Sequence, residues 1–323
     1  MKKYVIGVDI GGTKIAAGVV SAKSGKLKHK VVLPTLASKG RDASIAQVFR
    51  SIKEVLDISS VTIEDIEGIG LCAPGPLDPV AGIVHNPPNL PGWKEVPLSA
   101  MAEKEFKVKA RLENDANAAG MAEVKWGAAK GYKNVFYVTV STGIGTAIII
   151  DGKIYHGKNG MAGEGGHMTI NYDGKDEVCG CGNTGCIEAL ASGTNTEKAL
   201  IKKIKENPEL TTSLLDMADG RPEKITMVTI GEAAREGDEL ALETIKNQGR
   251  LIGIWLGSMI SLLDPEIIVI GGGVSMLGDI LFSEIRANIA THSINIFADK
   301  TPVVPAELKT NVGILGAASI LMV

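Results

Sequence analysis

Short apolar runs separated by glycine-rich turns predict a succession of buried strands and helices in the first half of the chain. The stretch "YVIGVDIGGTKIAAGVV" (residues 4–20) predicts two strands joined by a tight turn, and a further strand is expected over residues 28–35. Residues 42–56 carry apolar side chains at helical spacing, which predicts an amphipathic helix. "IEGIGLCAPGP" (residues 66–76) predicts a buried strand that enters a Pro/Gly loop.

A strand followed by a helix is predicted next. "VKARLEND" (residues 108–115) favours a strand, and the alanine-rich "ANAAGMAEVKWG" (residues 116–127) favours a helix with Asn114 or Asp115 as its polar N-cap. Residues from about 195 to 250 favour helix. The C-terminal "GILGAASILMV" predicts a last helix, which we expect to return to the N-terminal domain.

The second half of the chain repeats the pattern of the first. "VFYVTVSTGIGTAIIIDG" (residues 135–152) has the order of residues 4–20, and "DPEIIVIGGGVS" (residues 264–275) parallels "IEGIGLCAPGPL". The period is far longer than that of a solenoid repeat, which indicates a duplicated α/β unit. A length of 323 residues also favours two domains, and we expect a ligand in the cleft between them.

Composition excludes several classes of function. The net charge is −3, from 34 Lys and Arg against 37 Asp and Glu, and without a basic block the chain is not expected to bind nucleic acid. The longest apolar run, residues 251–263, is too short to span a bilayer and predicts a buried helix. No signal-peptide cleavage pattern follows the N-terminus, so we expect a soluble cytoplasmic protein without a membrane partner.

Three glycine-rich turns are candidate nucleotide contacts. Gly-rich tips present backbone N–H groups to an anion, and an acid beside such a tip can hold a magnesium ion that bridges phosphates. The alternative is a plain glycine turn, and neither a Walker motif nor a strand–GxGxxG–helix pattern is present. The candidates are Asp9, Gly11, Gly12, Thr13 and Lys14 in the first tip, the second tip at residues 141–146 with Thr142 and Gly143, and Gly271, Gly272 and Gly273.

An acid where a strand meets a helix is the candidate catalytic base. In "LEND", Asp115 could accept the proton of a substrate hydroxyl that attacks a γ-phosphate, since phosphoryl transfer needs positioning, charge neutralisation and one base. Asn114 suits a neighbouring sugar hydroxyl because its amide both donates and accepts. The alternative for both residues is simple N-capping of the helix.

A cysteine-rich segment predicts a metal site. His167, Cys179, Cys181 and Cys186 have the spacing H-x11-C-x-C-x4-C, and one imidazole with three thiolates is a closed tetrahedral zinc set, usually structural. The alternatives are free buried cysteines, or one disulfide with a thiol left over. Cys72 lies in a predicted buried strand and is expected to be a core thiol.

Carboxylates and amides near these motifs suit a sugar. Glu164 and Glu188 flank the cysteine-rich segment, and bidentate carboxylate contacts fit vicinal hydroxyls. The Pro-stiffened loop "NPPNLPGW" (residues 86–93) offers Asn86 and Asn89 for a further hydroxyl, with a plain surface loop as the alternative.

Together these motifs resemble the ROK family of the actin-like sugar-kinase superfamily, over nearly the whole chain. The segments that carry the resemblance are "DIGGTK" at 9–14, "APGP" at 73–76, "NPPNLPGW" at 86–93, "LENDANAA" at 112–119, "STGIGTA" at 141–147, "GMAGEGGH" at 160–167 and "CGCGNTGCIEA" at 179–189. The resemblance implies an α/β fold of two actin-like, ribonuclease H-like domains with an inter-domain cleft. The expected ranges are 1–114 with a returning helix at about 306–323, and 115–305 with the zinc knuckle.

The resemblance also implies an activity, ATP-dependent phosphorylation of glucose at the 6-hydroxyl, with Asp115 as general base. It implies that ATP phosphates meet both glycine tips, that the nucleoside lies near Gly271 to Gly273, and that Mg²⁺ lies near Asp9. The implied sugar contacts are Gly75, Asn89, Asn114, Asp115, Glu164, His167 and Glu188. The implied ligands of a structural zinc are His167, Cys179, Cys181 and Cys186. A homodimer is favoured, and a tetramer stays open.

Four alternatives remain at the level of sequence. The sugar could be N-acetylmannosamine, fructose, mannose or allose, and polyphosphate could replace ATP as donor. A non-catalytic sugar-sensing regulator is opposed by the first strand, which begins at about Tyr4 and leaves no room for the DNA-binding domain that family repressors add. A non-kinase ATPase is opposed by the Asn/Glu sugar set and the metal knuckle.

Overall fold

The chain divides into two compact units in a computed structural model that describes residues 3–174 and 177–322. Unit 1 comprises Met1–Tyr137, Ala147–Gly163 and Glu307–Val323, and unit 2 comprises Val138–Thr146 and Glu164–Ala306. The ranges expected from sequence, 1–114 with 306–323 and 115–305, include residues 1, 2, 175, 176 and 323, which lie outside the described part. That division of the chain stays a prediction.

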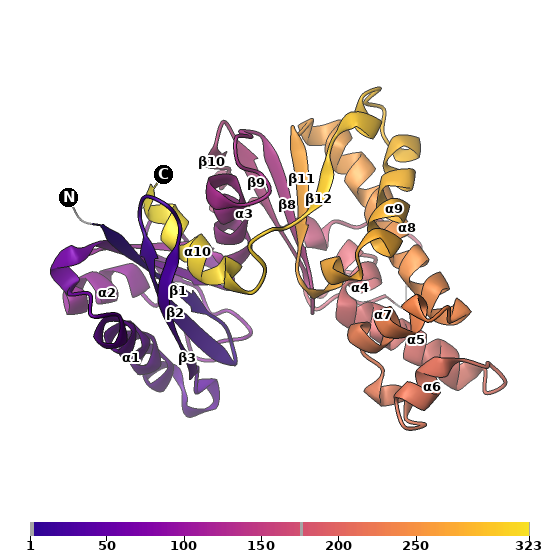
Figure 1. The fold of residues 1–323 in the computed structure, drawn as a ribbon, viewed down its shortest axis with the longest axis horizontal. Coiled ribbons are helices and arrows are strands. Elements are labelled where there is room, and N and C mark those ends of the chain that lie inside the picture. The colour runs from indigo at the N-terminus through magenta and orange to yellow at the C-terminus, as the bar shows by residue number, and fades with distance from the viewer. Residues whose placement is uncertain (1–2, 175–176, 323) are drawn as a thin grey trace. The chain divides into compact units, whose positions relative to one another are not determined.

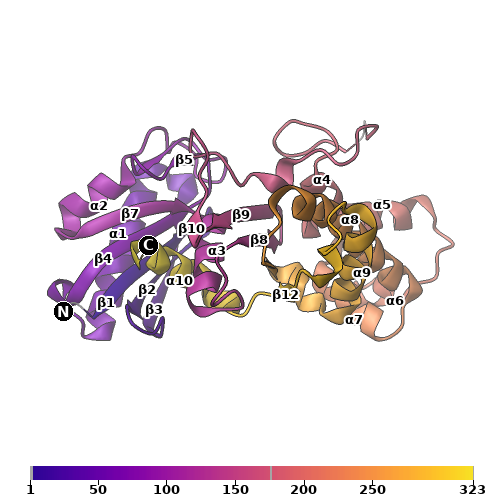
Figure 2. The same cartoon turned by 90° about the horizontal axis from the view of Figure 1, so that it is seen from above.

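The first five-stranded sheet lies in unit 1 and has the order β3-β2-β1-β4-β7 in the described residues (Figures 1 and 2). Its strands are β1 Tyr4–Ile10, β2 Lys14–Ser21, β3 Leu27–Pro34, β4 Ile66–Ala73 and β7 Lys109–Asn114. β1 pairs antiparallel with β2 and parallel with β4, and β4 pairs parallel with β7. A small ribbon, β5 Leu77–Asp78 with β6 Ile83–Val84, follows β4.

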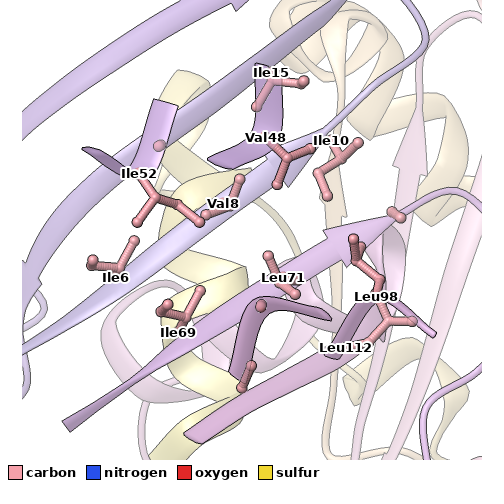
Figure 3. Close-up of a cluster of buried hydrophobic side chains, with 14 of the residues drawn as sticks. Ile6, Val8, Ile10, Ile15, Val48, Ile52, Ile69, Leu71, Leu98 and Leu112 are labelled. Carbon is pink, nitrogen blue, oxygen red and sulfur yellow. The ribbon is translucent and has the colours of Figure 1, made fainter. Parts of the chain in front are cut away.

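One face of this sheet builds the main core of unit 1. Alternate residues of β1, namely Ile6, Val8 and Ile10, are at most 1% exposed and belong to one cluster with Val48 and Ile52 of α1 Arg41–Ser59 (Figure 3). α2 Leu98–Phe106 adds Leu98, Ala102 and Phe106 to the same cluster. The strand period of two therefore points every second side chain of β1 at this helical layer.

The opposite face of the sheet receives α3 Asp115–Trp126 and α10 Val312–Ser319. Gly7 of β1 and Gly70 of β4 lie directly under α10, where a Cβ would overlap the carbonyl oxygens of Ile314 and Ala317. Glycine at these two positions lets the helix backbone approach the strands closely. The last helix thus packs on β1 and β4, the central strands of the unit (Figure 2).

The second five-stranded sheet has the order β10-β9-β8-β11-β12 in the described part of the chain. Its strands are β8 Val135–Val140, β9 Ile144–Ile150, β10 Lys153–Ile154, β11 Ile267–Gly271 and β12 Val303–Pro305. The boundary between the units falls within β8, after Tyr137, and within β9, after Thr146. The strand–turn–strand order of β1 and β2 recurs in β8 and β9, as the sequence repeat predicts.

Helices dominate unit 2. They are α4 Ile187–Ala191, α5 Gly193–Glu206, α6 Ser213–Met217, α7 Met227–Arg235, α8 Glu239–Leu263 and α9 Asp279–Ile289. The apolar run 251–263 forms the last half of α8, where Ile252, Trp255 and Ile260 are fully buried. Among the described residues, no helix combines the length and the apolar character needed to cross a membrane.

Single turns of 3₁₀ helix connect these elements. They are Ala37–Lys39, Ile63–Asp65, Gly165–His167, Pro222–Lys224, Gly273–Leu277, Ala290–His292, Ala298–Lys300, Lys309–Asn311 and Ile320–Met322.

Candidate active site

Three predicted segments of unit 1 meet at one edge of the first sheet. β1, β4 and β7 run parallel, so their carboxyl ends lie together, with Asp9 opposite Cys72 and Ala73 opposite Asn114. The first glycine tip follows β1, the loop with Gly75 follows β4, and the helix that carries Asp115 follows β7. The carboxyl edge of parallel strands is the usual place for a ligand in an α/β sheet.

The first glycine tip, residues 11–14, is a turn closed by a backbone hydrogen bond, and its side chains face solvent. The Gly11 N–H donates to the Lys14 carbonyl at 2.9 Å, while the Thr13 and Lys14 side chains are exposed. Gly12 lies against Asn89, since a Cβ there would overlap the Asn89 carbonyl oxygen. The structure therefore brings the predicted phosphate tip and the predicted sugar loop side by side.

Asp9 lies at the end of β1 beneath this tip. Burial raises the pKa of the Asp9 carboxyl, while a hydrogen bond from Cys72 and the charge of Lys14 oppose that rise. The Cys72 Sγ donates to Asp9 Oδ1 at 3.6 Å, and burial together with the Asp9 charge raises the pKa of this thiol well above its usual range. The expected core thiol is fully buried, and it also touches the predicted magnesium ligand.

Asp115 begins α3 and is exposed. Asn114 is the N-cap, and its Oδ1 accepts hydrogen bonds from the amides of Ala116 at 2.9 Å and Asn117 at 3.2 Å. The Asp115 Oδ1 accepts a second bond from the Ala116 amide at 2.8 Å. Asn114 thus caps the helix while the Asp115 carboxylate beside it stays accessible.

The second glycine tip, residues 141–143, joins β8 to β9 in unit 2. Its ends are tied by a bond from the Ser141 amide to the Gly143 carbonyl, and Thr142 is exposed. Gly271 ends β11 nearby, and Gly272 has a positive φ of 85° and lies against the Val140 carbonyl. The second tip and the predicted nucleoside turn therefore adjoin one another.

Glu188, in the first turn of α4, links the second tip to the cysteine-rich segment. Its Oε2 accepts a hydrogen bond from the Ile144 amide at 2.8 Å. The same oxygen lies so close to Gly143 that a Cβ at that position would overlap it. Its Oε1 lies 3.6 Å from Cys179 Sγ and 3.9 Å from His167 Nδ1. The carboxylate thus holds a fixed place between the two motifs.

The four predicted metal ligands come together. Ligand atoms of His167, Cys179, Cys181 and Cys186 all lie within 4.8 Å of one another, with Cys179 Sγ 3.4 Å from His167 Nδ1 and Cys181 Sγ 3.8 Å from Cys186 Sγ. A tetrahedron with bonds of about 2.3 Å has edges of about 3.8 Å, so the donor set fits zinc. The three cysteines of this set are free thiols in the structure, as is Cys72.

Comparison with known proteins shows the family of the chain. The model of the ROK family matches residues 5–322.

The chain belongs to the ROK family. It is 36% identical to a glucokinase of Thermotoga maritima over 99% of this chain and 98% of the relative. It is 29% identical to a xylose repressor of Bacillus spizizenii over 99% of this chain and 77% of that protein. The crystal structure of a ROK family glucokinase from Streptomyces griseus in complex with glucose and AMPPNP superposes with a TM-score of 0.83, at 33% identity and 98% coverage of both chains.

The thiols of this ROK chain differ in acidity. Burial raises the pKa of Cys179 to about 12 and also raises the pKa of Cys186. Burial would likewise raise the pKa of the exposed Cys181, but hydrogen bonds from the Asn183 amide and the neighbouring thiols hold it below its usual value. Binding of zinc requires thiolates, so the metal would have to displace the protons of the two less acidic cysteines.

The predicted site residues of the ROK chain divide between the units. Those in unit 1 are Asp9, Gly11, Gly12, Thr13, Lys14, Gly75, Asn89, Asn114 and Asp115. Those in unit 2 are Thr142, Gly143, Glu164, His167, Cys179, Cys181, Cys186, Glu188, Gly271, Gly272 and Gly273. Glu164 is exposed just before the turn that carries His167. Their roles as binding and catalytic residues stay predictions.

Two residues near the end of β7 and after β10, Glu113 and His156, form a contact that no sequence motif indicates. Glu113 is 4% exposed, and its Oε2 lies 2.7 Å from His156 Nε2. Glu113 lies in a quoted motif, but nothing in the spacing indicates a partner 43 residues away.

Proposed function

We propose that this chain is an ATP-dependent hexokinase that transfers the γ-phosphoryl group of ATP to the 6-hydroxyl of glucose, the first step of glycolytic glucose use. The observation that carries the proposal is whole-chain similarity to glucokinases, one of them solved with glucose and AMPPNP. The donor is ATP, with polyphosphate as the alternative. The proposed setting is the cytoplasm, and the proposed assembly is a homodimer, with a tetramer as the alternative.

The proposed reaction assigns one chemical step to Asp115. The 6-hydroxyl oxygen attacks the γ-phosphorus, the bond to the bridging oxygen of ADP breaks, and the hydroxyl proton passes to the Asp115 carboxylate. Asp115 is exposed at the same carboxyl edge of the sheet as the tip at residues 11–14, which supports this role. The other proposed sugar contacts are Gly75, Asn89, Asn114, Glu164, His167 and Glu188.

Backbone amides bind the proposed nucleotide. Gly11, Gly12 and Gly143 carry no Cβ that could block a phosphate, although the Gly11 N–H is already bonded to the Lys14 carbonyl. Thr13 and Thr142 add hydroxyls, and Lys14 adds a positive charge. The nucleoside is proposed to lie near Gly271 to Gly273. Mg²⁺, when bound, supplies charge neutralisation between phosphates, and Asp9 has the carboxylate to hold it directly or through water.

Zinc is proposed to bind His167, Cys179, Cys181 and Cys186 and to act structurally. Glu188 Oε1 lies beside this cluster, and its Oε2 holds the second tip. A rigid cluster would thus orient both His167 and Glu188 toward the sugar.

An Asp115→Asn variant tests the assignment. The amide keeps the shape of the side chain but cannot take a proton, so we expect kcat for glucose to fall by about 100-fold or more while glucose still binds. Coupled ATP turnover and titration calorimetry measure the two effects. Asp42→Asn is the matched control, since Asp42 is also an exposed acid in the first turn of a helix of unit 1. Near-normal turnover by Asp115→Asn would contradict the proposal.

A further inference from the structure

Glu113 is a buried acid that the proposed reaction does not use. Its side chain is 6% exposed, although it lies near the end of β7, two residues before the candidate base. A buried carboxylate is costly unless donors surround it. Its Oε1 accepts from the Asn114 amide at 2.9 Å and from Asn117 Nδ2 at 3.0 Å, and its Oε2 faces His156 Nε2 at 2.7 Å. The three partners together satisfy the charge.

These contacts hold the chain on both sides of Asp115. Asn114 precedes it and Asn117 follows it by two residues, so one carboxylate ties the end of β7 to the first turn of α3. Asn114 also caps α3 through its own side chain. The Glu113 carboxylate therefore contacts the chain on both sides of Asp115.

His156 is the donor that fixes Glu113 from a different part of unit 1. It follows β10, and the Ala162 amide donates to its backbone carbonyl at 3.0 Å. In this bond the Glu113 carboxylate is the acceptor when His156 Nε2 carries the proton. The hydrogen bond with Glu113 raises the pKa of His156, against the opposing effect of burial. Either protonation state of the ring can donate through Nε2.

The pair forms part of the wall of a cavity of about 610 Å³. Lys109, Arg111 and Ile154 also line it, and the His156 side chain is 32% exposed. The position is open enough to accept another polar side chain. A substitution there can remove the donor without leaving a hole in a core.

We infer that Glu113 and His156 are positioning residues, which hold Asn114 and Asp115 in the orientation that phosphoryl transfer requires. The inference rests on the proposed function of Asp115. It predicts that loss of the His156 donor lets the Glu113 carboxylate turn, frees the Asn114 amide and misplaces the base. The phosphate tip at residues 11–14 does not depend on this bond.

Two amide variants of His156 distinguish the loss of the hydrogen-bond donor from the loss of the imidazole ring. A Gln places its amide nitrogen near the position of Nε2, whereas an Asn is too short to reach Glu113. We expect His156→Asn to lower kcat about tenfold with the KM for ATP unchanged within about twofold, because a small misplacement of a catalytic group is costly. We expect His156→Gln to keep most of the wild-type kcat. His29→Asn, an exposed position on β3 at the opposite edge of the same sheet, should match the wild type.

Hydrogen exchange of the Asn114 amide tests the bond without turnover. We expect faster exchange in His156→Asn than in His156→Gln, and a similar melting temperature for both. Equal kcat and equal exchange in the two variants would overturn the inference. A large loss of melting temperature in His156→Asn would also overturn it, since the pair would then serve stability. A wild type that phosphorylates no hexose would refute the proposed function, while the exchange comparison would still decide whether the pair holds Asn114.

Discussion

The Glu188 side chain contacts both the second glycine tip and the predicted zinc ligands of unit 2. One oxygen holds the Ile144 amide behind the second glycine tip, and the other faces Cys179 and His167. The sequence motif predicts this residue as a sugar contact alone. The contact with the tip spans 44 residues and has no local signal, so only the fold reveals it.

Removal of one thiol should release the proposed zinc. Cys181 is the exposed member of the cluster, so Cys181→Ser changes a ligand with little effect on packing. We expect about one zinc per wild-type chain and a clear loss in the variant, measured by elemental analysis after dialysis. The KM for glucose should rise with it, because His167 and Glu188 lose their support.

Cys72→Ser is the matched control for zinc content. Cys72 lies outside the cluster and contacts Asp9. It should retain the metal of the wild type. Full zinc content in Cys181→Ser would reject this set of ligands.

At the scale of elements, α8 is held at its start by Asp238. Its carboxylate accepts bonds from the Ala241 amide at 2.9 Å, Thr212 Oγ1 at 2.8 Å and the Ser213 amide at 2.7 Å. Burial would raise the pKa of Asp238, but these hydrogen bonds outweigh it and lower the pKa. One side chain therefore caps the longest described helix and binds the first residues of α6.

Asp238→Asn should weaken folding in a pH-dependent way. We expect a loss of about 1 kcal/mol in the free energy of unfolding at pH 7, measured with denaturant. Asn remains a good N-cap, but a neutral amide weakens the charge-assisted bonds from Thr212 and Ser213. A lowered folded pKa stabilises the protein above the unfolded pKa of about 3.9, and this contribution disappears as the pH falls through the folded value. The difference between wild type and variant should therefore shrink below about pH 4.

Asp279→Asn serves as the control for α8. Asp279 is also a first-turn acid, on α9, and is exposed. Its loss should cost less than about 0.5 kcal/mol. A pH-independent loss in Asp238→Asn would contradict the assigned ionisation.

The periodicity of apolar residues predicted most elements closely. The helix expected over residues 42–56 is α1 Arg41–Ser59, and the one expected over residues 116–127 is α3 Asp115–Trp126. Local patterns suffice here, because a buried face repeats along each element. The predicted run 251–263 is only the second half of α8. The first half of that helix is more polar, so the apolar run does not show where the helix begins.

Contacts between distant segments could not be predicted. Residue type alone indicates the tip at residues 11–14, Asn89 and Asp115 as candidate site residues. The parallel register of β1, β4 and β7 brings the loops that carry them to one edge of the sheet. Cys72 beneath Asp9 and His156 against Glu113 are partners across 63 and 43 residues. Neither pair has a spacing rule, so sequence alone gives no reason to join them.

At the scale of the whole molecule, ROK membership fixes the fold class and leaves the activity to be measured. Glucokinases and a xylose repressor both match nearly all of this chain. Those names describe different activities for similar sequences, so the distinction between a kinase and a repressor must come from individual side chains. The carboxylate of Asp115 and the two glycine tips are the features on which the kinase proposal depends.

The most direct test is turnover of ATP across a panel of hexoses. Purified protein with ATP and Mg²⁺ is assayed with glucose, mannose, fructose, allose and N-acetylmannosamine, and the phosphorylated product is identified. The account predicts that glucose has the highest kcat/KM and yields glucose 6-phosphate. A clear preference for another hexose would contradict the glucose assignment, and the absence of phosphoryl transfer to any hexose would contradict the kinase itself.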